Sequence, residues 1–85
     1  MKELLEWLAV SYDKTITCTI SGTLFSTTFT IIEPKVIIRN NIVFINGDGI
    51  DELYFNEKLS VSSWTDGMTV YYDITVSEDI TITLW

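Results

Sequence analysis

The sequence predicts a mainly β domain of the α+β class: an antiparallel meander sheet, or a small sandwich or barrel, of about six or seven strands with one short N-terminal helix. Two observations predict it. Hydrophobic residues recur at helical spacing only near the N-terminus and alternate with polar residues elsewhere. The links between alternating segments are short, and short links join antiparallel strands, because a parallel crossover needs a dozen or more residues. With 85 residues, the chain is expected to form a single domain, 1–85.

The segment from Lys2 to Val10 is expected to form the helix. Its apolar residues share one side, and they are Leu4, Leu5 and Leu8, with Trp7 beside them. The charged residues of the segment fall largely on the other side. Because so short a helix is marginal alone in water, we expect its leucine face to pack on the sheet.

The first predicted hairpin joins two alternating segments, Thr15–Ser21 and Leu24–Ile32, through a turn at Gly22. In the first segment Cys18 shares a face with two isoleucines, so we interpret it as a small buried hydrophobic residue rather than a reactive thiol. Pro34 ends the second strand. A second hairpin is expected from Val36 to Asn46, with Asn40-Asn41 in a type I′ turn, since asparagine tolerates positive φ.

The rest of the chain predicts further short strands. Glu52–Phe55 and Leu59–Trp64 are candidates, although polar residues interrupt the alternation and leave the number of strands between Gly47 and Trp64 open. The clearest alternation is at the end of the sequence, where Thr69–Val76 and Ile80–Leu84 are joined by the turn Ser77-Glu78-Asp79. Asp66-Gly67 supplies the turn before them.

The composition argues against catalysis. The chain has no histidine and one cysteine, which removes the commonest general base and the usual zinc ligands. We therefore expect no enzyme activity, no cofactor and no metal. One segment, Asn46 to Tyr54, resembles the glycine-aspartate repeat of calcium-binding parallel β-rolls, but a single copy lacks half of the ligands, so an acidic surface loop is the favoured interpretation.

The net charge of −7 lies in the second half of the sequence. From Gly47 onward there are eight acidic residues and a single cation, Lys58; the acids are Asp48, Asp51, Glu52, Glu57, Asp66, Asp73, Glu78 and Asp79. The negative electrostatic field of these acids repels the phosphate backbone of nucleic acids and attracts basic protein surfaces. The expected partner is a basic protein surface rather than nucleic acid or a membrane. With acids among the first leucines, we see no export signal and expect a cytoplasmic protein.

Three aromatic residues fall on polar positions of the alternation and should point outward or toward a sheet edge: Trp64, Tyr71 and Trp85. They either shield neighbouring strands, or they form an interface in which aromatic side chains anchor and acids steer a basic partner. The threonine rows of Thr15–Thr19 and Thr81–Thr83 are expected to be ordinary solvent-facing strand positions, although ice-binding or carbohydrate-binding surfaces have similar rows.

Very small, acidic, histidine-free chains with one helix and a few antiparallel strands resemble the inhibitors that phages carry against bacterial defence, including anti-CRISPR proteins. The resemblance is one of size, charge and layout. It implies a protein in the cytoplasm of a bacterial host that occupies a basic nucleic-acid-binding surface of a defence nuclease. The eight acids would then imitate phosphates, with Trp64 and Tyr71 as apolar anchors.

Two other functions fit the sequence. A structural or assembly module, such as a phage accessory or virion component, would form a homo-oligomer through strand edges such as Ile80–Leu84, since few lysines or prolines guard the strands. A calcium-binding or carbohydrate-binding protein is the third candidate. The effect of salt on binding distinguishes the inhibitor from the assembly module. Electrostatically steered binding to a basic partner weakens as ionic strength rises, whereas pairing of strand edges does not.

Overall fold

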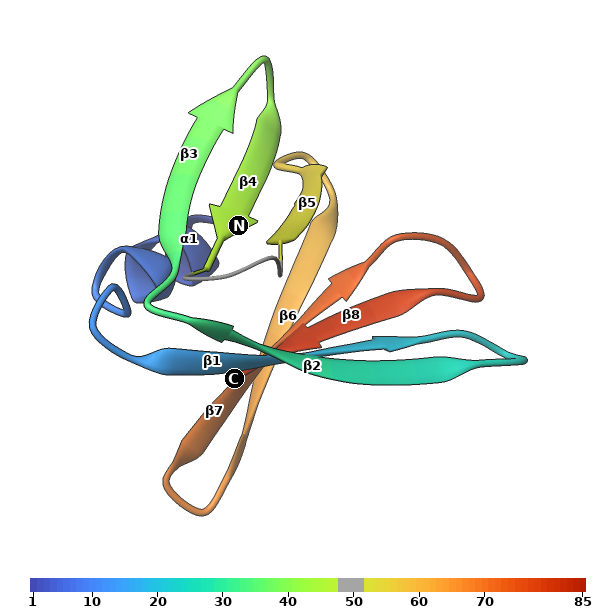
Figure 1. Ribbon diagram of the computed structural model, residues 1–85. Helices are drawn as coiled ribbons and strands as arrows, with labels where there is room; N and C mark the ends of the chain where they lie inside the picture. The colour runs from blue at the N-terminus through green and yellow to red at the C-terminus, as the bar shows by residue number, and fades with distance from the viewer. Residues whose placement is uncertain (48–51) are drawn as a thin grey trace.

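The computed structural model describes residues 1–47 and 52–85, and it confirms the predicted mainly β class. One helix, α1 (Lys2–Ala9), precedes eight strands in the described residues (Figure 1). The strands are β1 (Thr15–Ser21), β2 (Ser26–Ile32), β3 (Lys35–Arg39), β4 (Ile42–Asn46), β5 (Glu52–Asn56), β6 (Ser60–Asp66), β7 (Thr69–Thr75) and β8 (Thr81–Leu84). The count exceeds the predicted six or seven, because the stretch whose strand number was left open forms both β5 and β6.

The strands form two antiparallel sheets. The five-stranded sheet has the order β2-β1-β8-β7-β6, and the three-stranded sheet has the order β3-β4-β5. Consecutive strands are neighbours within each sheet, and the meander closes where β8 pairs with β1. The expectation that Ile80–Leu84 forms a sheet edge is therefore wrong: β8 lies at the centre of the five-stranded sheet, and β2 and β6 are its edges.

The turns follow their local chemistry. Asn40 and Asn41 adopt φ values of 53° and 66° between β3 and β4, which confirms the predicted type I′ turn. Gly67 (φ 64°) opens the two-residue turn between β6 and β7, where glycine avoids the cost of positive φ. In the first hairpin β2 starts at Ser26, two residues later than predicted, and the Gly22 N–H donates to the Phe25 carbonyl at 2.7 Å beside the turn.

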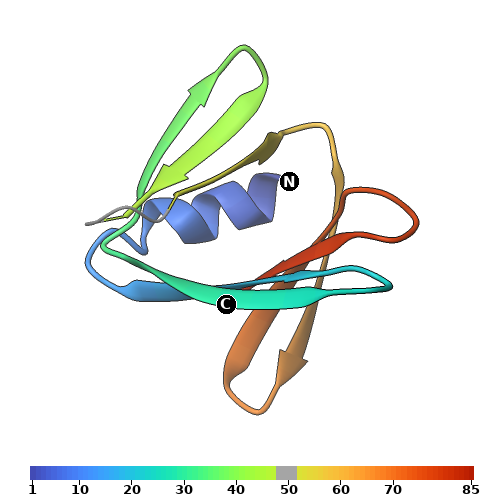
Figure 2. The ribbon, with the colours of Figure 1, turned by 45° about the vertical axis from the view of Figure 1, so that its right-hand side comes forward.

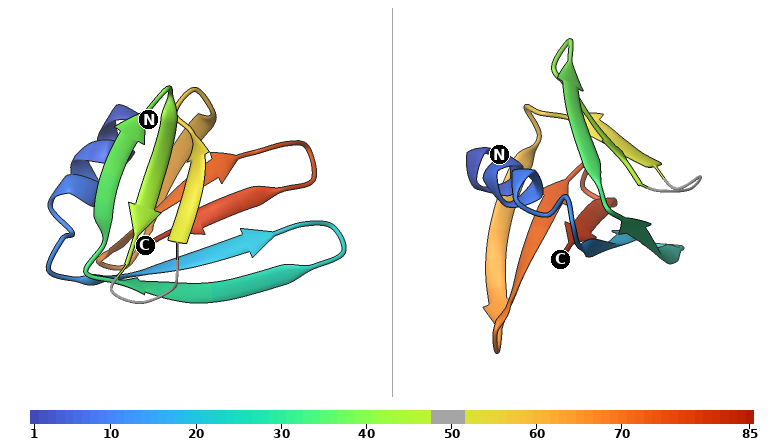
Figure 3. Two further views of the ribbon diagram at one scale, coloured as in Figure 1. Left: turned by 45° about the horizontal axis from the view of Figure 1, so that its top comes forward. Right: turned by 60° about the vertical axis from the view of Figure 1, so that its left-hand side comes forward.

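Three layers enclose the core. Helix α1 and the three-stranded sheet both lie on one side of the five-stranded sheet, and in Figure 2 the helix lies between the two sheets. Figure 3 shows the three-stranded sheet crossing over the larger one. The chain passes from one sheet to the other at Glu33 and the buried Pro34, where Glu33 takes a left-handed φ of 51° and its N–H donates to the Lys14 carbonyl.

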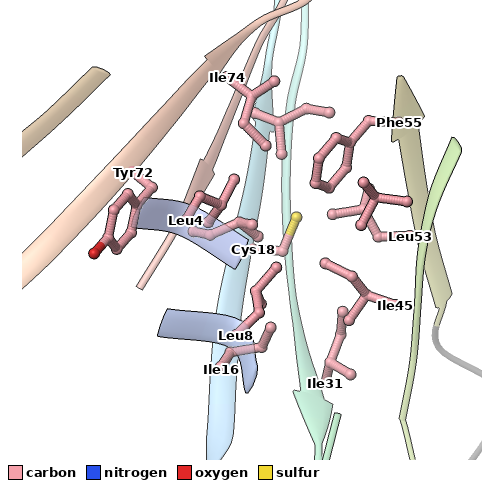
Figure 4. Close-up of a cluster of buried hydrophobic side chains, with 13 residues drawn as sticks. Leu4, Leu8, Ile16, Cys18, Ile31, Ile45, Leu53, Phe55, Tyr72 and Ile74 are labelled. Atoms are coloured by element: carbon pink, nitrogen blue, oxygen red, sulfur yellow. The ribbon is translucent and has the colours of Figure 1, made fainter. Parts of the chain in front are cut away.

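Side chains from all three layers meet in one hydrophobic cluster (Figure 4). The five-stranded sheet contributes Ile16, Cys18, Ile31, Tyr72, Ile74, Ile82 and Leu84, the smaller sheet contributes Val43, Ile45, Leu53 and Phe55, and the helix contributes Leu4 and Leu8. In β1, β4, β5, β7 and β8 the buried residues are two apart, as the two-residue alternation predicts, and Val36 of β3 and Val61 of β6 pack against the cluster. The opposite face of the five-stranded sheet is left to solvent.

Helix α1 is held by this burial. Leu4 and Leu8 are almost fully buried, whereas Leu5 is only partly buried. Trp7 packs on the Tyr72 ring with centroids 5.1 Å apart. The buried Ser11 hydroxyl donates to the Trp7 carbonyl at 2.7 Å and so satisfies one backbone acceptor of the last turn.

We predict that Leu8→Ala lowers the free energy of unfolding by about 2–5 kcal/mol, because it removes buried methyl groups and leaves a cavity. Leu5→Ala is the matched control in the same helix and should have a much smaller effect. Urea unfolding followed by circular dichroism measures both. Equal losses in the two variants would contradict the view that the leucine face anchors the helix.

Cys18 is fully buried, and burial raises the pKa of its thiol from 9.0 to about 12. This confirms the interpretation of Cys18 as a core residue. A thiol with so high a pKa stays protonated near neutral pH and is a weak nucleophile.

The raised pKa predicts a loss of stability at alkaline pH. Above pH 9 the unfolded chain releases the Cys18 proton and the folded chain retains it, so this contribution is intact below pH 9 and is lost as the pH rises toward 12. Cys18→Ala removes the titration, so its unfolding free energy, measured in urea from pH 8 to 10.5, should fall less steeply than that of the wild type. Parallel curves would refute this account.

Candidate functional site

The outer face of the five-stranded sheet is the surface with the most distinctive composition. It carries the side chains that alternate with the core residues of β1, β2, β6, β7 and β8. Only six of these outer-face residues are not serine or threonine, and they are Ile32, Trp64, Asp66, Tyr71, Asp73 and Trp85. The polar hydroxyl rows predicted from the sequence therefore join into one continuous surface.

Trp64, Tyr71 and Trp85 form an aromatic row across three neighbouring strands. Trp64 and Tyr71 are direct cross-strand partners, and their rings stack with centroids 4.0 Å apart and an interplanar angle of 8°. The Tyr71 and Trp85 rings are 5.3 Å apart and tilted by 45°. Aromatic pairs at such distances are each worth about 0.5–1.5 kcal/mol beyond their burial.

The rings of the stacked pair stand upright on the sheet. Neighbouring strands lie about 4.8 Å apart, so two parallel rings with centroids 4.0 Å apart must have their normals directed from strand to strand. The pair therefore presents ring edges to solvent. One face of the Trp64 indole is covered by Tyr71 and the other is directed beyond the edge strand β6, and Trp64 remains 45% exposed.

The Asp73 carboxylate holds this arrangement in place. The Trp64 Nε1–H donates to Asp73 Oδ2 at 2.9 Å, and the Thr83 hydroxyl donates to Asp73 Oδ1 at 2.7 Å. These bonds connect β6, β7 and β8 through side chains. Both carboxylate oxygens accept a hydrogen bond within the sheet, so Asp73 orients the indole.

The other acids of the predicted site are spread over the molecule. Asp66 ends β6, whereas Glu78 and Asp79 lie in the β7–β8 turn at the opposite end of β7, about 20 Å away for a strand of this length (Figure 1). Glu57 lies in the β5–β6 turn, and the exposed Glu52 begins β5 in the other sheet. Asp48 and Asp51 lie outside the described residues. Of the predicted residues, the structure brings together Trp64, Tyr71 and Asp73.

Two residues that the site prediction left out belong to this site: Trp85, which was expected to point outward or toward a sheet edge, and Thr83, which binds Asp73. Both come from the end of the chain, beside Tyr71 and Asp73, because β8 pairs with β7. The register of that hairpin, centred on its turn, is the sequence signal that could have identified them.

Two of the five cations, Lys35 and Arg39, lie on a different surface. The pairs Ile37–Phe44 and Phe44–Tyr54 form an apolar strip on the outer face of the three-stranded sheet, and Arg39 and Lys35 lie on either side of it. The Phe44 and Tyr54 rings are 5.8 Å apart. This strip and the aromatic row lie on the outer faces of two different sheets.

The remaining chemistry is limited. Within residues 1–47 and 52–85, no group of three or more acidic, cysteine or histidine side chains could hold a metal ion. The β-roll resemblance does not extend to the strands, because β4 and β5 pair antiparallel with Asn46 opposite Glu52. In the same residues no helix has the length and apolar character needed to cross a membrane.

Comparison with known proteins adds no relative. No family model matches the chain, and neither a curated protein nor a solved structure matches it. The site is therefore interpreted from its own geometry.

We predict that Asp73→Ala releases the Trp64 indole. Without its acceptor, the Trp64 Nε1–H should exchange with solvent faster in NMR, and the free energy of unfolding should fall by about 1–2 kcal/mol. Asp66→Ala is the control, because Asp66 is an acid at the end of β6 that makes neither bond. A Trp64 exchange rate that responds equally to both substitutions would argue against the orienting role of Asp73.

Proposed function

We propose that the chain is a non-catalytic binding protein that docks a basic protein surface against the aromatic row of Trp64, Tyr71 and Trp85. The observation that carries the proposal is the preorganised row itself. A carboxylate fixes the exposed Trp64 indole before any partner arrives, and an anchor that is already ordered loses less entropy on binding.

The composition of the face supports a protein partner. Tryptophan and tyrosine are the side chains most enriched in interface hot spots, and hydroxyl groups around them supply adaptable hydrogen bonds. The upright rings offer edges and one indole face, which suits insertion between side chains better than stacking against a flat ring. The face thus has an apolar centre and a polar surround, as protein interfaces do.

Charge supports a basic partner. Among the described outer-face residues of the five-stranded sheet there is no lysine or arginine, whereas Asp66 and Asp73 are present and Glu78 and Asp79 follow at the end of β7. Because these carboxylates are far apart and Asp73 is already bonded, they are suited to steering a basic partner. A phosphate-like row would need closer spacing. We infer aromatic anchoring with electrostatic steering in place of close nucleic-acid mimicry.

The narrower proposal concerns the identity of the partner. A nucleic-acid-binding effector of bacterial defence is the basic protein that the resemblance to phage inhibitors implies, and an acidic chain with an aromatic anchor could cover its binding channel. Two properties support a role in blocking the effector. The sequence lacks histidine, the commonest general base in catalysis, and the net charge of −7 repels nucleic acid itself.

The test is an affinity capture from bacterial lysate at low and high salt, followed by titration of the captured protein. We expect capture at low salt, loss of capture at high salt, and at least about tenfold weaker binding by Trp64→Ala/Tyr71→Ala. The matched control is Phe44→Ala/Tyr54→Ala, which removes an aromatic pair from the other sheet. Equal weakening by both double variants, or capture that salt does not affect, would overturn the proposal.

A further inference from the structure

We propose that two copies of this chain pair antiparallel through the free edge of β2 and form one continuous sheet about a two-fold axis. The inference goes beyond the proposed function, and it assigns a specific edge to self-association. It depends on β2, its backbone pattern and its charge, none of which contributes to the aromatic row.

The backbone pattern of β2 shows which groups are free. In the first hairpin the Gly22 N–H donates to the Phe25 carbonyl and the Glu33 N–H donates to the Lys14 carbonyl. Bonded pairs alternate along an antiparallel ladder, so the intervening odd-numbered residues of β2 bond to β1. The N–H and C=O groups of Ser26, Thr28 and Thr30 therefore point away from β1. Among the described strands, none pairs with β2 on that side.

The β2 edge has no charged residue and no proline to guard it against pairing. No charged residue and no proline occurs between Lys14 and Glu33, a stretch that includes all of β1 and β2. Natural edge strands are commonly guarded by lysine, proline or inward-pointing charges. The other edges have charge at their ends: Lys58 and Asp66 flank or end β6, and Lys35 and Arg39 begin and end β3.

The absence of charge also selects the partner. A basic partner gains no attraction from a neutral edge, whereas two copies that each carry −7 can approach with least repulsion where no carboxylate lies. A second copy also presents an edge of identical pleat, because antiparallel pairing about a two-fold axis keeps outer-face residues opposite outer-face residues.

The position of Gly47 favours one register. A Cβ at Gly47 would come within 3.1 Å of the Ile32 backbone nitrogen, so the chain closely approaches that end of β2, whereas Ser26, Thr28 and Thr30 are exposed among the described residues. Pairing centred on Thr28 places Thr28 opposite the same residue of the second copy, with Ser26 opposite Thr30. The two copies would share up to about six backbone hydrogen bonds.

Exposed apolar residues at the two ends of β2 fit the same register. Leu24 and Phe25, at one end, are 95% and 52% exposed, and Ile32, at the other end, is 49% exposed. Antiparallel pairing brings the hairpin tip of one copy beside Ile32 of the other. Burial of these side chains would add apolar contact to the backbone hydrogen bonds.

The experiment is sedimentation of the purified chain over a range of concentrations. We expect the apparent mass to rise from 9.7 kDa toward twice that value with concentration, and salt should not weaken the association. Thr28→Pro removes only an outward N–H, and Thr28→Glu places two carboxylates opposite each other; each should shift the dissociation constant by at least about tenfold.

Two control variants test whether the loss of association is specific to the backbone edge of β2. Thr28→Val removes the Thr28 hydroxyl, which bonds to the Thr19 hydroxyl at 2.9 Å, but retains the N–H and should still associate. Ser60→Glu adds the same charge at the opposite edge and should also associate. A mass of 9.7 kDa at every concentration, or unchanged association in folded Thr28→Glu, would overturn the inference without affecting the proposed partner binding.

Discussion

The pairing of the last strand with the first is the interaction on which the rest of the structure depends. The Thr17 N–H donates to the Trp85 carbonyl at 2.8 Å, and the Trp85 N–H donates to the Thr17 carbonyl at 3.0 Å. This contact joins the N-terminal hairpin to the C-terminal hairpin in one sheet. Without it, β8 would have no neighbour on one side, and the core residues of β1 and β2 would be separated from those of β7 and β8.

Side-chain hydrogen bonds order the outer face on the C-terminal side of this sheet. The Asp73 carboxylate lies between Trp64 and Thr83, which come from the strands on either side of β7, so one side chain on β7 orients a residue on each neighbouring strand. Hydrogen bonds to a charged acceptor are stronger than neutral ones. The aromatic row is thus a product of sheet order, because each of its members comes from a different strand.

Local features of this fold could be predicted from the sequence, whereas features that depend on strand order could not. The turn at Asn40-Asn41, the short N-terminal helix and the inward position of Cys18 follow from nearest-neighbour chemistry and two-residue alternation. The central position of β8 does not follow, because the alternation of Ile80–Leu84 is the same in an edge strand and in a central one.

The candidate site could likewise be predicted from the sequence only in part. Trp64, Tyr71 and Asp73 could be nominated from parity and charge, and they do lie together. The clustering of the acids could not be judged from the sequence, because Asp66 and Asp79 are close along the chain yet lie at opposite ends of β7. Asp66 lies beside the turn before β7 and Asp79 lies in the turn after it, so the full length of this strand separates the two carboxylates.

The two edges of the five-stranded sheet have opposite properties, and this difference relates the two proposed surfaces. The β2 edge is neutral and rich in threonine, whereas the β6 edge carries the exposed indole and Asp66. Four strand spacings, about 19 Å, separate them. Pairing through β2 therefore leaves both aromatic rows uncovered and places them at the two ends of a joined sheet. In the joined sheet the two β7 strands would be seven strand spacings, about 34 Å, apart. A partner with two basic sites at about that separation would then bind both rows, and the second contact would form at high effective concentration.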